Sequence, residues 1–238
     1  MKSLSESQII EQLKQIDTPT ISNVVATYPG HKLCLNLYDA WYGNWYTDSN
    51  MKCMFPDFGI RVGFAATVVY TLKHPKQPPT DKWVLIDHIE DTKRPIALVA
   101  QQIFPLEIAN RVSLFGGMSS TKYSALNVVA TITNGPIRDL DEIRETGVQH
   151  YATGLTPAHG DMVEVAVGVP VTVCGLSVSP GDMLHMDRHG IVKFPGAKMD
   201  QVLKNALKFL ELEEDEKRYL NDPKFSVAKW KEYSKKIH

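Results

Sequence analysis

Two short segments of the sequence combine residue types that could do chemistry. In the first, Gly135-Pro136 predicts a tight turn directly after a β-branched run, and the turn presents Arg138 beside Asp139. Ligand sites in open α/β folds favour the carboxyl ends of strands. The guanidinium fork suits a carboxylate ligand, and a hard carboxylate suits Mg²⁺ or Mn²⁺ held largely by water. The alternative is a surface arginine beside an aspartate that caps the following helix.

The second segment is a glycine turn that leads into a predicted helix. Gly116-Gly117 is followed by Met118, Ser119 and Ser120. Backbone N–H groups at a helix N-terminus can bind a carboxylate or a phosphate. The alternative is a plain turn before a helix, so the segment alone leaves the question open.

The spacing of these segments resembles a known family. Gly117, twenty residues, Arg138-Asp139, two residues and Glu142 resemble the signature shared by the regulator-of-ribonuclease-activity A family and the 4-hydroxy-4-methyl-2-oxoglutarate/4-carboxy-4-hydroxy-2-oxoadipate aldolases. Other blocks follow in the family's order, so that the resemblance covers roughly residues 16 to 195. These blocks are Ile16–Asn23, Gly63–Val68, Pro170-Val171, Val178–Asp182 and Asp187–Val192.

The resemblance implies an α/β fold, an αββαβ sandwich of the swivelling-domain kind, with an N-terminal helix and a C-terminal helical extension. It also implies a homotrimer or homohexamer with sites in clefts between subunits. Arg138 would bind the pyruvyl carboxylate and carbonyl, and Asp139 would hold a divalent metal, Mg²⁺ or Mn²⁺, partly through waters. Backbone amides of the 116–119 segment (Gly116, Gly117, Met118 and Ser119) would bind the substrate, and Glu213 or Glu214 of a neighbouring subunit would reach the metal.

The activity that the resemblance implies is carbon–carbon cleavage of a 4-hydroxy-2-oxo acid to pyruvate. Lewis-acid polarisation and the arginine charge would stabilise the pyruvate enolate, so oxaloacetate decarboxylation is an expected side activity. Aldolase members commonly carry aspartate where this chain has Gly117. Two alternatives stay open: a non-catalytic regulator that binds a ribonuclease or another protein, and a related metal–enolate enzyme that acts on sugar acids.

The composition limits the classes of function. The chain has 238 residues, 43% of them hydrophobic and 22% charged, which suits one principal domain with a full core. A net charge of -1 and a pI near 6.7 leave no basic excess for nucleic acid. No apolar run approaches the ~20 residues of a membrane span, so we expect no membrane partner and a cytoplasmic location. The three cysteines lack a CxxC spacing, which indicates reduced thiols.

Strands and helices that must position the two segments alternate along the sequence. A helix is expected after Ser5, with its apolar pattern stopped by Pro19. Three prolines, Pro75, Pro78 and Pro79, are expected to separate two strands. We predict one catalytic domain over residues 1–197 and a helical extension over residues 198–238 that packs on a neighbouring subunit. The predicted strands are 60–71, 83–89, 127–133, 162–167, 169–173 and 184–186, and the later helices are 139–145 and 198–219.

Three further groups of residues have less specific patterns. His159, His185 and His189 fit no standard metal motif, so we expect structural or surface roles for them. Asp182 and Asp187 lie in predicted turns, where a side-chain bond to the backbone is the common role. Residues 38–46 hold five aromatics beside Gly43, which favours an interface or the mouth of a ligand site.

Overall fold

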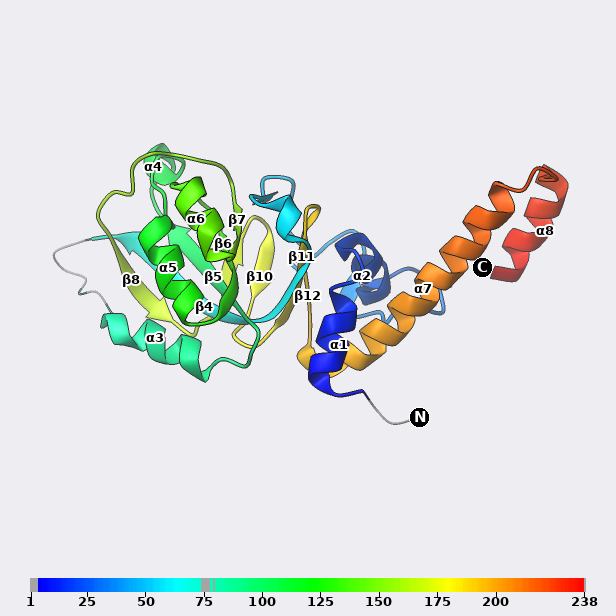
Figure 1. The fold of residues 1–238 in the computed structure, drawn as a ribbon, viewed down its shortest axis with the longest axis horizontal. Helices are drawn as coiled ribbons and strands as arrows, with labels where there is room; N and C mark the ends of the chain where they lie inside the picture. Colours follow the sequence, from blue (N-terminus) through cyan, green and yellow to red (C-terminus); the bar gives the residue numbers. More distant parts are fainter. Residues whose placement is uncertain (1–3, 74–77, 79, 238) are drawn as a thin grey trace. The chain divides into compact units, whose positions relative to one another are not determined.

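The computed structural model describes residues 4–73, 78 and 80–237 (Figure 1), and the chain divides into two compact units. One unit comprises Asn44–Gly196, and the other combines Met1–Gly43 with Ala197–His238. Pro75 and Pro79 lie outside the described residues. The predicted fold class is confirmed at the level of a mixed α/β fold with helices at both ends of the chain.

A strongly paired sheet forms the centre of the unit Asn44–Gly196. Its order is β12-β11-β4-β5-β6-β7-β3, and β8 also pairs with β4. The strands β4, β5, β6 and β7 are parallel neighbours, whereas β8, β11 and β12 are antiparallel to their partners. The strand bounds are β3 Lys52–Cys53, β4 Arg61–Leu72, β5 Ile96–Ile103, β6 Val128–Thr133, β7 Gln149–Ala152, β8 Met162–Val167, β11 Met183–Asp187 and β12 Gly190–Phe194.

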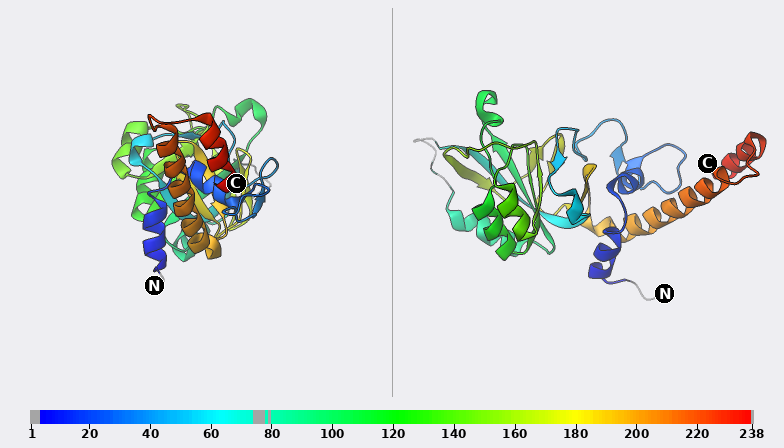
Figure 2. Two further views of the ribbon diagram at one scale, coloured as in Figure 1. Left: turned by 90° about the vertical axis from the view of Figure 1, so that its right-hand side faces the viewer. Right: turned by 45° about the horizontal axis from the view of Figure 1, so that its top comes forward.

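The two faces of the sheet are covered differently. Alternate side chains of β4 enter two separate cores, because successive residues of a strand point to opposite faces. One core receives side chains from the helices, and α5 and α6 lie side by side over it (Figures 1 and 2). The hairpin of β9 and β10 covers the other core. The bounds are α3 Lys82–Asp91, α4 Leu106–Ala109, α5 Gly117–Ala125, α6 Leu140–Thr146, β9 Val171–Val173 and β10 Leu176–Val178, with a short 3₁₀ turn at Pro56–Phe58.

The second unit is mainly helical. The buried stripe of α7, which contains Val202, Leu203 and Ala206, packs with α1 and α2. The Asn205 amide donates to the Leu33 carbonyl at 2.8 Å, and His31 stacks on Phe209. The elements are α1 Glu6–Leu13, α2 Thr18–Val25, β1 Ala26–Thr27, β2 Tyr38–Asp39, α7 Met199–Leu220 and α8 Val227–Ile237.

Residues 83–89 form part of helix α3, so the strand predicted there is wrong. The Asp81 carboxylate caps this helix by accepting from the Trp83 amide at 3.0 Å. Leu85 and Ile89 are buried four residues apart, which is helical spacing. Pro19, which was expected only to stop a helix, lies in the first turn of α2 behind the cap residue Asp17.

The predicted boundary at residue 197 lies close to the break between the units at Gly196. The first 43 residues, however, cluster with the C-terminal helices and not with the sheet. Packing of residues 198–238 on a neighbouring subunit stays a prediction. Among the described residues, no helix combines the length and the apolar composition that a bilayer crossing requires.

Candidate active site

A cavity of about 500 Å³ lies where the loops after the parallel strands meet the helices α5 and α6. All six residues of the Gly116–Ser119 and Arg138-Asp139 segments line this cavity, so the structure brings the two predicted segments together. The other lining residues are Tyr70, Ser113, Leu114, Phe115, Lys122, Tyr123, Glu142, His159 and Met162.

Backbone pairing beyond the sheet holds the loops in place. Phe115 and Ile137 form a parallel bridge, and Ile137 forms another with Leu155. The Arg138 amide donates to the Phe115 carbonyl at 3.1 Å, and the Ser113 amide donates to the Ala158 carbonyl at 2.8 Å. The loops after β5, β6 and β7 therefore continue the order of the strands and fix the position of the glycine turn relative to the arginine.

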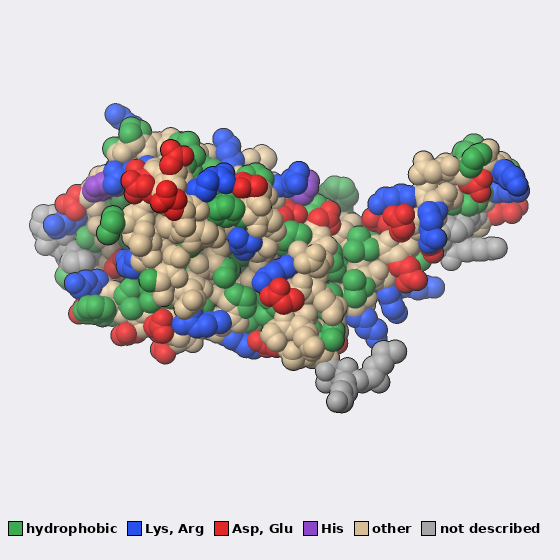
Figure 3. All heavy atoms as spheres, viewed as in Figure 1, with side chains coloured by type: hydrophobic (Ala, Val, Ile, Leu, Met, Phe, Trp, Pro, Cys, Tyr) green, Lys and Arg blue, Asp and Glu red, His purple; other side chains and the backbone are tan. Residues whose placement is uncertain are grey.

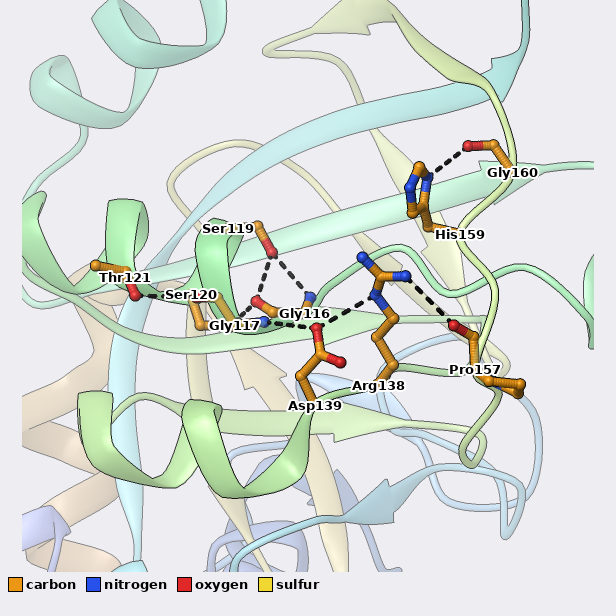
Figure 4. A network of polar contacts seen from close by, with 10 residues as sticks. All are labelled: Gly116, Gly117, Ser119, Ser120, Thr121, Arg138, Asp139, Pro157, His159 and Gly160. Atoms are coloured by element: carbon orange, nitrogen blue, oxygen red, sulfur yellow. Dashed lines mark hydrogen bonds and ion pairs between the residues drawn. The ribbon is translucent and has the colours of Figure 1, made fainter.

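The glycine turn begins helix α5 as the sequence predicts. Gly116 is the N-cap, and its amide donates to the Ser119 hydroxyl, which donates back to the Gly116 carbonyl, each at 2.9 Å (Figure 4). The Gly117 amide donates to Oδ2 of Asp139 at 3.2 Å. The amides of Met118 and Ser119 belong to the first turn of α5, where a helix offers its N–H groups no acceptor of its own. This helix end can therefore bind an anion.

Arg138 and Asp139 form an ion pair within the cavity lining. Nε of Arg138 lies 3.2 Å from Oδ2 of Asp139, and the two side chains are 34% and 36% exposed. The Arg138 guanidinium also donates to the Pro157 carbonyl at 3.3 Å. In Figure 4 the guanidinium points away from the sheet toward His159, while the carboxylate turns toward Gly117. Both charged groups are partly desolvated and remain open to a ligand.

Asp139 does not cap helix α6 with its side chain, although it precedes the helix directly. Its backbone is left-handed, with φ 59 and ψ 45, and its carboxylate makes no capping hydrogen bond. A side-chain cap requires an extended backbone at that position. The alternative that Asp139 is an ordinary N-cap is therefore wrong, because the carboxylate binds the Gly117 amide instead.

Glu142 brings a second carboxylate to the same cavity. It lies so close to Gly117 that a β-carbon at residue 117 would overlap Oε2 of Glu142 and would lie 2.9 Å from its β-carbon. Gly116 is similarly close to Asp139, since a β-carbon there would lie 2.6 Å from Oδ2. Both glycines are required by close approach, and both carboxylates are held against the glycine turn.

The carboxylate pair suits a hard divalent cation that is held by one or two carboxylates and several waters. Among the described residues, no three His, Cys, Asp or Glu side chains gather closely enough to form a complete protein cage. Glu213 and Glu214 belong to α7 in the other unit, and Glu213 pairs with Lys217 at 3.6 Å. Their predicted reach into the site of a neighbouring subunit stays a prediction.

His150 supports the glycine turn through Ser120, and no pattern in the sequence indicates this role. It is fully buried on β7, with Nε2 3.0 Å from the Ser120 hydroxyl and Nδ1 2.7 Å from the Thr131 hydroxyl. Ser120 in turn donates to the Gly116 carbonyl at 2.9 Å. Burial lowers the pKa of His150 to about 3, so the ring is neutral. Its partners lie 30 and 19 residues earlier, so no local spacing indicates the contact.

The remaining predicted residues have the roles that their contexts indicate. Asp182 accepts from the Ser179 amide at 2.9 Å, and Asp187 accepts from the His189 amide at 2.7 Å, so both serve turns. His159 is exposed but lines the cavity beside Arg138. The aromatic segment divides at the boundary between the units, since Trp45 is buried and Trp41 is 84% exposed.

The fold and the cavity define a mixed α/β protein in which a glycine turn at a helix N-terminus and a carboxylate pair lie at the carboxyl ends of parallel strands. The chain belongs to the RraA-like family, because the family model described as Aldolase/RraA matches residues 34–193. This confirms the family to which the sequence motifs point.

Individual relatives are similar to this chain only at low sequence identity. A protein of Azotobacter vinelandii named "Putative 4-hydroxy-4-methyl-2-oxoglutarate aldolase" is 29% identical over 143 residues, which are 60% of this chain and 83% of that protein. Protein DlpA of Legionella pneumophila is 24% identical over 83 residues, 34% of this chain and only 14% of DlpA. The structure of Streptomyces coelicolor RraAS2, described as an unusual member of the RNase ES inhibitor RraA protein family, superposes with a TM-score of 0.65. It is 19% identical, covers 91% of this chain and 99% of that one, and supports the fold alone.

Proposed function

We propose that the protein is a divalent-metal-dependent lyase that cleaves a 4-hydroxy-2-oxo acid to pyruvate. The observation that carries the proposal is the meeting of an arginine, a helix N-terminus and two carboxylates in one cavity of about 500 Å³. Such a cavity can hold an anionic substrate and a cation together. Relatives named as aldolases support the same reaction class.

The cationic side of the cavity binds the 2-oxo acid. The Arg138 fork pairs with the substrate carboxylate and with the oxygen of the 2-oxo group, on which negative charge develops. First-turn amides of Met118 and Ser119 add hydrogen bonds from the helix N-terminus. Asp139 keeps Nε of Arg138 in place at 3.2 Å, so the fork is oriented before the substrate arrives.

On the anionic side Asp139 would hold the metal, with Glu142 as a second carboxylate beside it. When bound, the metal supplies Lewis-acid polarisation of the 2-oxo group and so stabilises the enolate that carbon–carbon cleavage leaves. Oxaloacetate decarboxylation leaves the same enolate, and we propose it as a side activity. The physiological assembly that we propose is a homotrimer or homohexamer, in which Glu213 or Glu214 of a neighbouring subunit completes the metal site.

Removal of the metal or of Asp139 tests the proposal directly. We expect pyruvate release from 4-hydroxy-4-methyl-2-oxoglutarate and from oxaloacetate with Mg²⁺ or Mn²⁺, above the rate of the metal alone. Chelator should abolish the release, and Asp139→Ala should lower kcat/KM by at least about 100-fold, because the loss of charge stabilisation at an enolate costs several kcal/mol. Asp141→Ala is the matched control, since Asp141 lies on α6 outside the cavity lining. Full activity of Asp139→Ala in the presence of chelator would contradict the proposal.

A second candidate is a regulator that binds a protein partner such as a ribonuclease. The acidic residues Asp141, Glu142 and Glu145 of α6 favour it, and acidic side chains gather on this part of the surface (Figure 3). The described relationship of RraAS2 to ribonuclease inhibitors is consistent with such a role. A pull-down with this chain as bait separates the candidates: a stable ribonuclease complex together with no turnover favours the regulator, and turnover without a partner favours the lyase.

A further inference from the structure

Lys122 brings a second cation to the candidate active site. It lines the same cavity as Arg138, Asp139 and Glu142. Nε of Arg138 is paired with Asp139 at 3.2 Å, whereas no carboxylate forms an ion pair with Lys122 among the residues that the structure describes. The ammonium group of Lys122 therefore remains able to bind an anionic ligand.

The geometry of helix α5 places Lys122 along the cavity. Lys122 lies three residues after Ser119 and four after Met118, and residues at these spacings share one face of a helix. Side chains of a helix lean toward its N-terminus, so that of Lys122 extends back toward the turn that holds the Met118 and Ser119 amides. The second cation is thus about one helical turn away from the amides that would bind the 2-oxo acid.

The wall beside Lys122 favours a strong pairing with an anion. The ammonium group lies 4.9 Å from the centre of the Tyr123 ring, which is buried. Tyr123 belongs to the apolar core that also contains Tyr70 and Phe115, and all three residues line the cavity. A charge pair is stronger where apolar groups replace part of the surrounding water. A carboxylate that reaches Lys122 would therefore be bound more tightly than at an open surface.

His159 is the other basic side chain of the lining, but its neutral ring cannot donate to a carboxylate. Its Nδ1 lies 2.6 Å from the Gly160 carbonyl, which can only accept, so Nδ1 carries the hydrogen. In the neutral ring Nε2 is then an acceptor. Arg138 and Lys122 are therefore the two side chains that offer N–H groups to an anion.

The charges of the lining indicate how many negative charges a ligand can bring. Two cationic side chains, Arg138 and Lys122, accompany two carboxylates, Asp139 and Glu142, so the lining is formally balanced when His159 is neutral. The divalent metal of the proposed lyase would add two positive charges. A substrate with two carboxylates would balance them, whereas a substrate with one would leave Lys122 without a partner in a partly desolvated place.

We propose that Lys122 binds the distal carboxylate of a dicarboxylic 4-hydroxy-2-oxo acid and determines the preference for such substrates. The inference rests on the proposed lyase function, in which Arg138 and the first-turn amides of α5 bind the 2-oxo acid end. Lys122 pairs with the carboxylate attached to C4. A substrate with a methyl group in that place gains no such pair and removes water from the ammonium group. Because C4 belongs to the part that leaves as the second product, Lys122 acts on substrate selection and not on the enolate.

Two substrates that differ in one group test this subsite. 4-Hydroxy-2-oxoglutarate carries a carboxylate on C4, 4-hydroxy-2-oxopentanoate carries a methyl group there, and both release pyruvate when the C3–C4 bond breaks. For the metal-loaded wild type we expect a kcat/KM at least about tenfold higher for the dicarboxylate. Lys122→Met should lower that value at least about tenfold, through KM, and should change the value for the methyl substrate by less than about twofold. Lys122→Arg keeps the charge and should restore most of the preference.

Unreactive analogues test the same subsite without turnover. 2-Oxoglutarate and 2-oxopentanoate lack the 4-hydroxyl group and differ in the same carboxylate. Titration calorimetry on the metal-loaded wild type should give the lower Kd for 2-oxoglutarate, and Lys122→Met should lose this difference. The preference should also weaken as the ionic strength is raised, because salt screens an ion pair at a partly exposed site.

Lys82→Met is the matched control. The Lys82 ammonium also lies over a neighbouring aromatic ring, 5.3 Å from the centre of Trp83, but Lys82 does not line the candidate active site. This variant should keep the wild-type preference.

The outcomes separate the subsite from the lyase function. An equal loss of both substrates in Lys122→Met, or a wild type without preference for the dicarboxylate, would overturn the subsite and leave the lyase function intact. A wild type that turns over neither substrate overturns the lyase function, and the calorimetry then decides on the subsite. Equal affinity of the wild type and Lys122→Met for 2-oxoglutarate would overturn it, whereas weaker binding by Lys122→Met alone would support it.

Discussion

The backbone of Asp139 determines where its carboxylate lies. Its conformation is left-handed, with φ 59, which aspartate adopts more readily than most residues other than glycine, and it turns the carboxylate toward Gly117 instead of toward the helix that follows. One oxygen, Oδ2, then accepts from the Gly117 amide and pairs with Arg138. In the proposed lyase the other carboxylate oxygen would face the metal, so a single backbone conformation would set the order of charges in the cavity.

The close approach of Gly117 and Glu142 predicts that a methyl group is not tolerated at residue 117. In Gly117→Ala the added carbon overlaps the Glu142 carboxylate, so Glu142 must leave the cavity lining or α6 must shift. We expect kcat/KM for pyruvate release to fall at least tenfold, while the free energy of unfolding falls by no more than about 2 kcal/mol. Steady-state kinetics and urea unfolding measure both quantities.

Gly154→Ala is the control for that substitution, because no atom lies within 4 Å of a β-carbon built at residue 154. It should keep wild-type activity. Equal activities of the two alanine variants would mean that the position of Glu142 is irrelevant to catalysis.

Local sequence patterns predict the charged residues of the site, but they do not predict the buried contacts that hold these residues in place. Arg138 and Asp139 follow a β-branched strand and a turn signal, so local patterns suffice to predict them. Glu142 was visible as part of the motif, but its packing against Gly117 depends on the crossing of α5 and α6. His150 reaches the site only through partners far away in the chain, and no local pattern encodes such contacts.

Among the elements, the junction of α5 with β6 and β7 determines whether the glycine turn stays in place. His150 of β7 bonds to Ser120 of α5 and to Thr131 of β6, and its ring lies 5.9 Å from that of Phe115. Both ring nitrogens have hydroxyl partners, and the ring is buried in a neutral form. Protonation would place a charge in the core without a carboxylate partner among these contacts.

Because the His150 ring is buried in its neutral form, we predict that the folded protein loses stability in acid. Its pKa in the folded protein is about 3, below the 6.5 of an exposed histidine. The unfolded chain therefore binds the proton first as the pH falls below about 6.5, and stability decreases by up to about 1.4 kcal/mol per pH unit down to about pH 3. Urea unfolding at pH 7.5, 6, 5 and 4 should give a shallower dependence for His150→Gln. His159→Gln changes an exposed ring and should follow the wild type, and identical slopes for all three proteins would refute the assignment.

The elements also show where sequence patterns succeed and where they fail. The strand β6 and the helices α6 and α7 appear close to the predicted bounds, because their β-branched run and their amphipathic patterns are strong. The strand β5, Ile96–Ile103, lies between β4 and β6 but was not predicted. Its alanines, leucine and glutamines have weak strand preference, and parallel pairing on both sides overrides it. The Trp, Val and Ile residues of α3 favour a strand in the sequence, whereas the structure has a helix that begins at the Asp81 cap.

At the scale of the whole molecule, the chain leaves apolar surface on its helix α7 and on the turn between α7 and α8. The first half of α7 is buried within its own unit. Farther along, Leu212 is 36% exposed, Leu220 is 41% exposed and Phe225 is 38% exposed, although the surrounding residues are strongly charged. These side chains are what the predicted packing on a neighbouring subunit requires, since buried leucine or phenylalanine contributes about 1.5–3 kcal/mol.

We therefore predict that the variant Leu212→Asn/Phe225→Asn has a lower mass in solution than the wild type. Light scattering after size exclusion should give a trimer or a hexamer for the wild type and smaller species for the variant. Leu106→Asn replaces an even more exposed leucine, on α4, and serves as the control that keeps its mass. A monomeric wild type, or a variant with unchanged mass, would show that these side chains do not join subunits.

The backbone pairing of the loops after β5, β6 and β7 has a consequence for the timing of catalysis. Loops that carry active sites are commonly the first parts of a protein to open, and ordering them on binding consumes part of the affinity. Here ladder-like bridges join the loops, and the amides of Leu114, Ile137, Arg138 and Thr156 donate to carbonyls of the neighbouring loops. These four amides should therefore exchange with deuterated water as slowly as those of the strands. A substrate would bind to a site whose loops are already ordered. Loop closure would therefore not limit the rate of turnover.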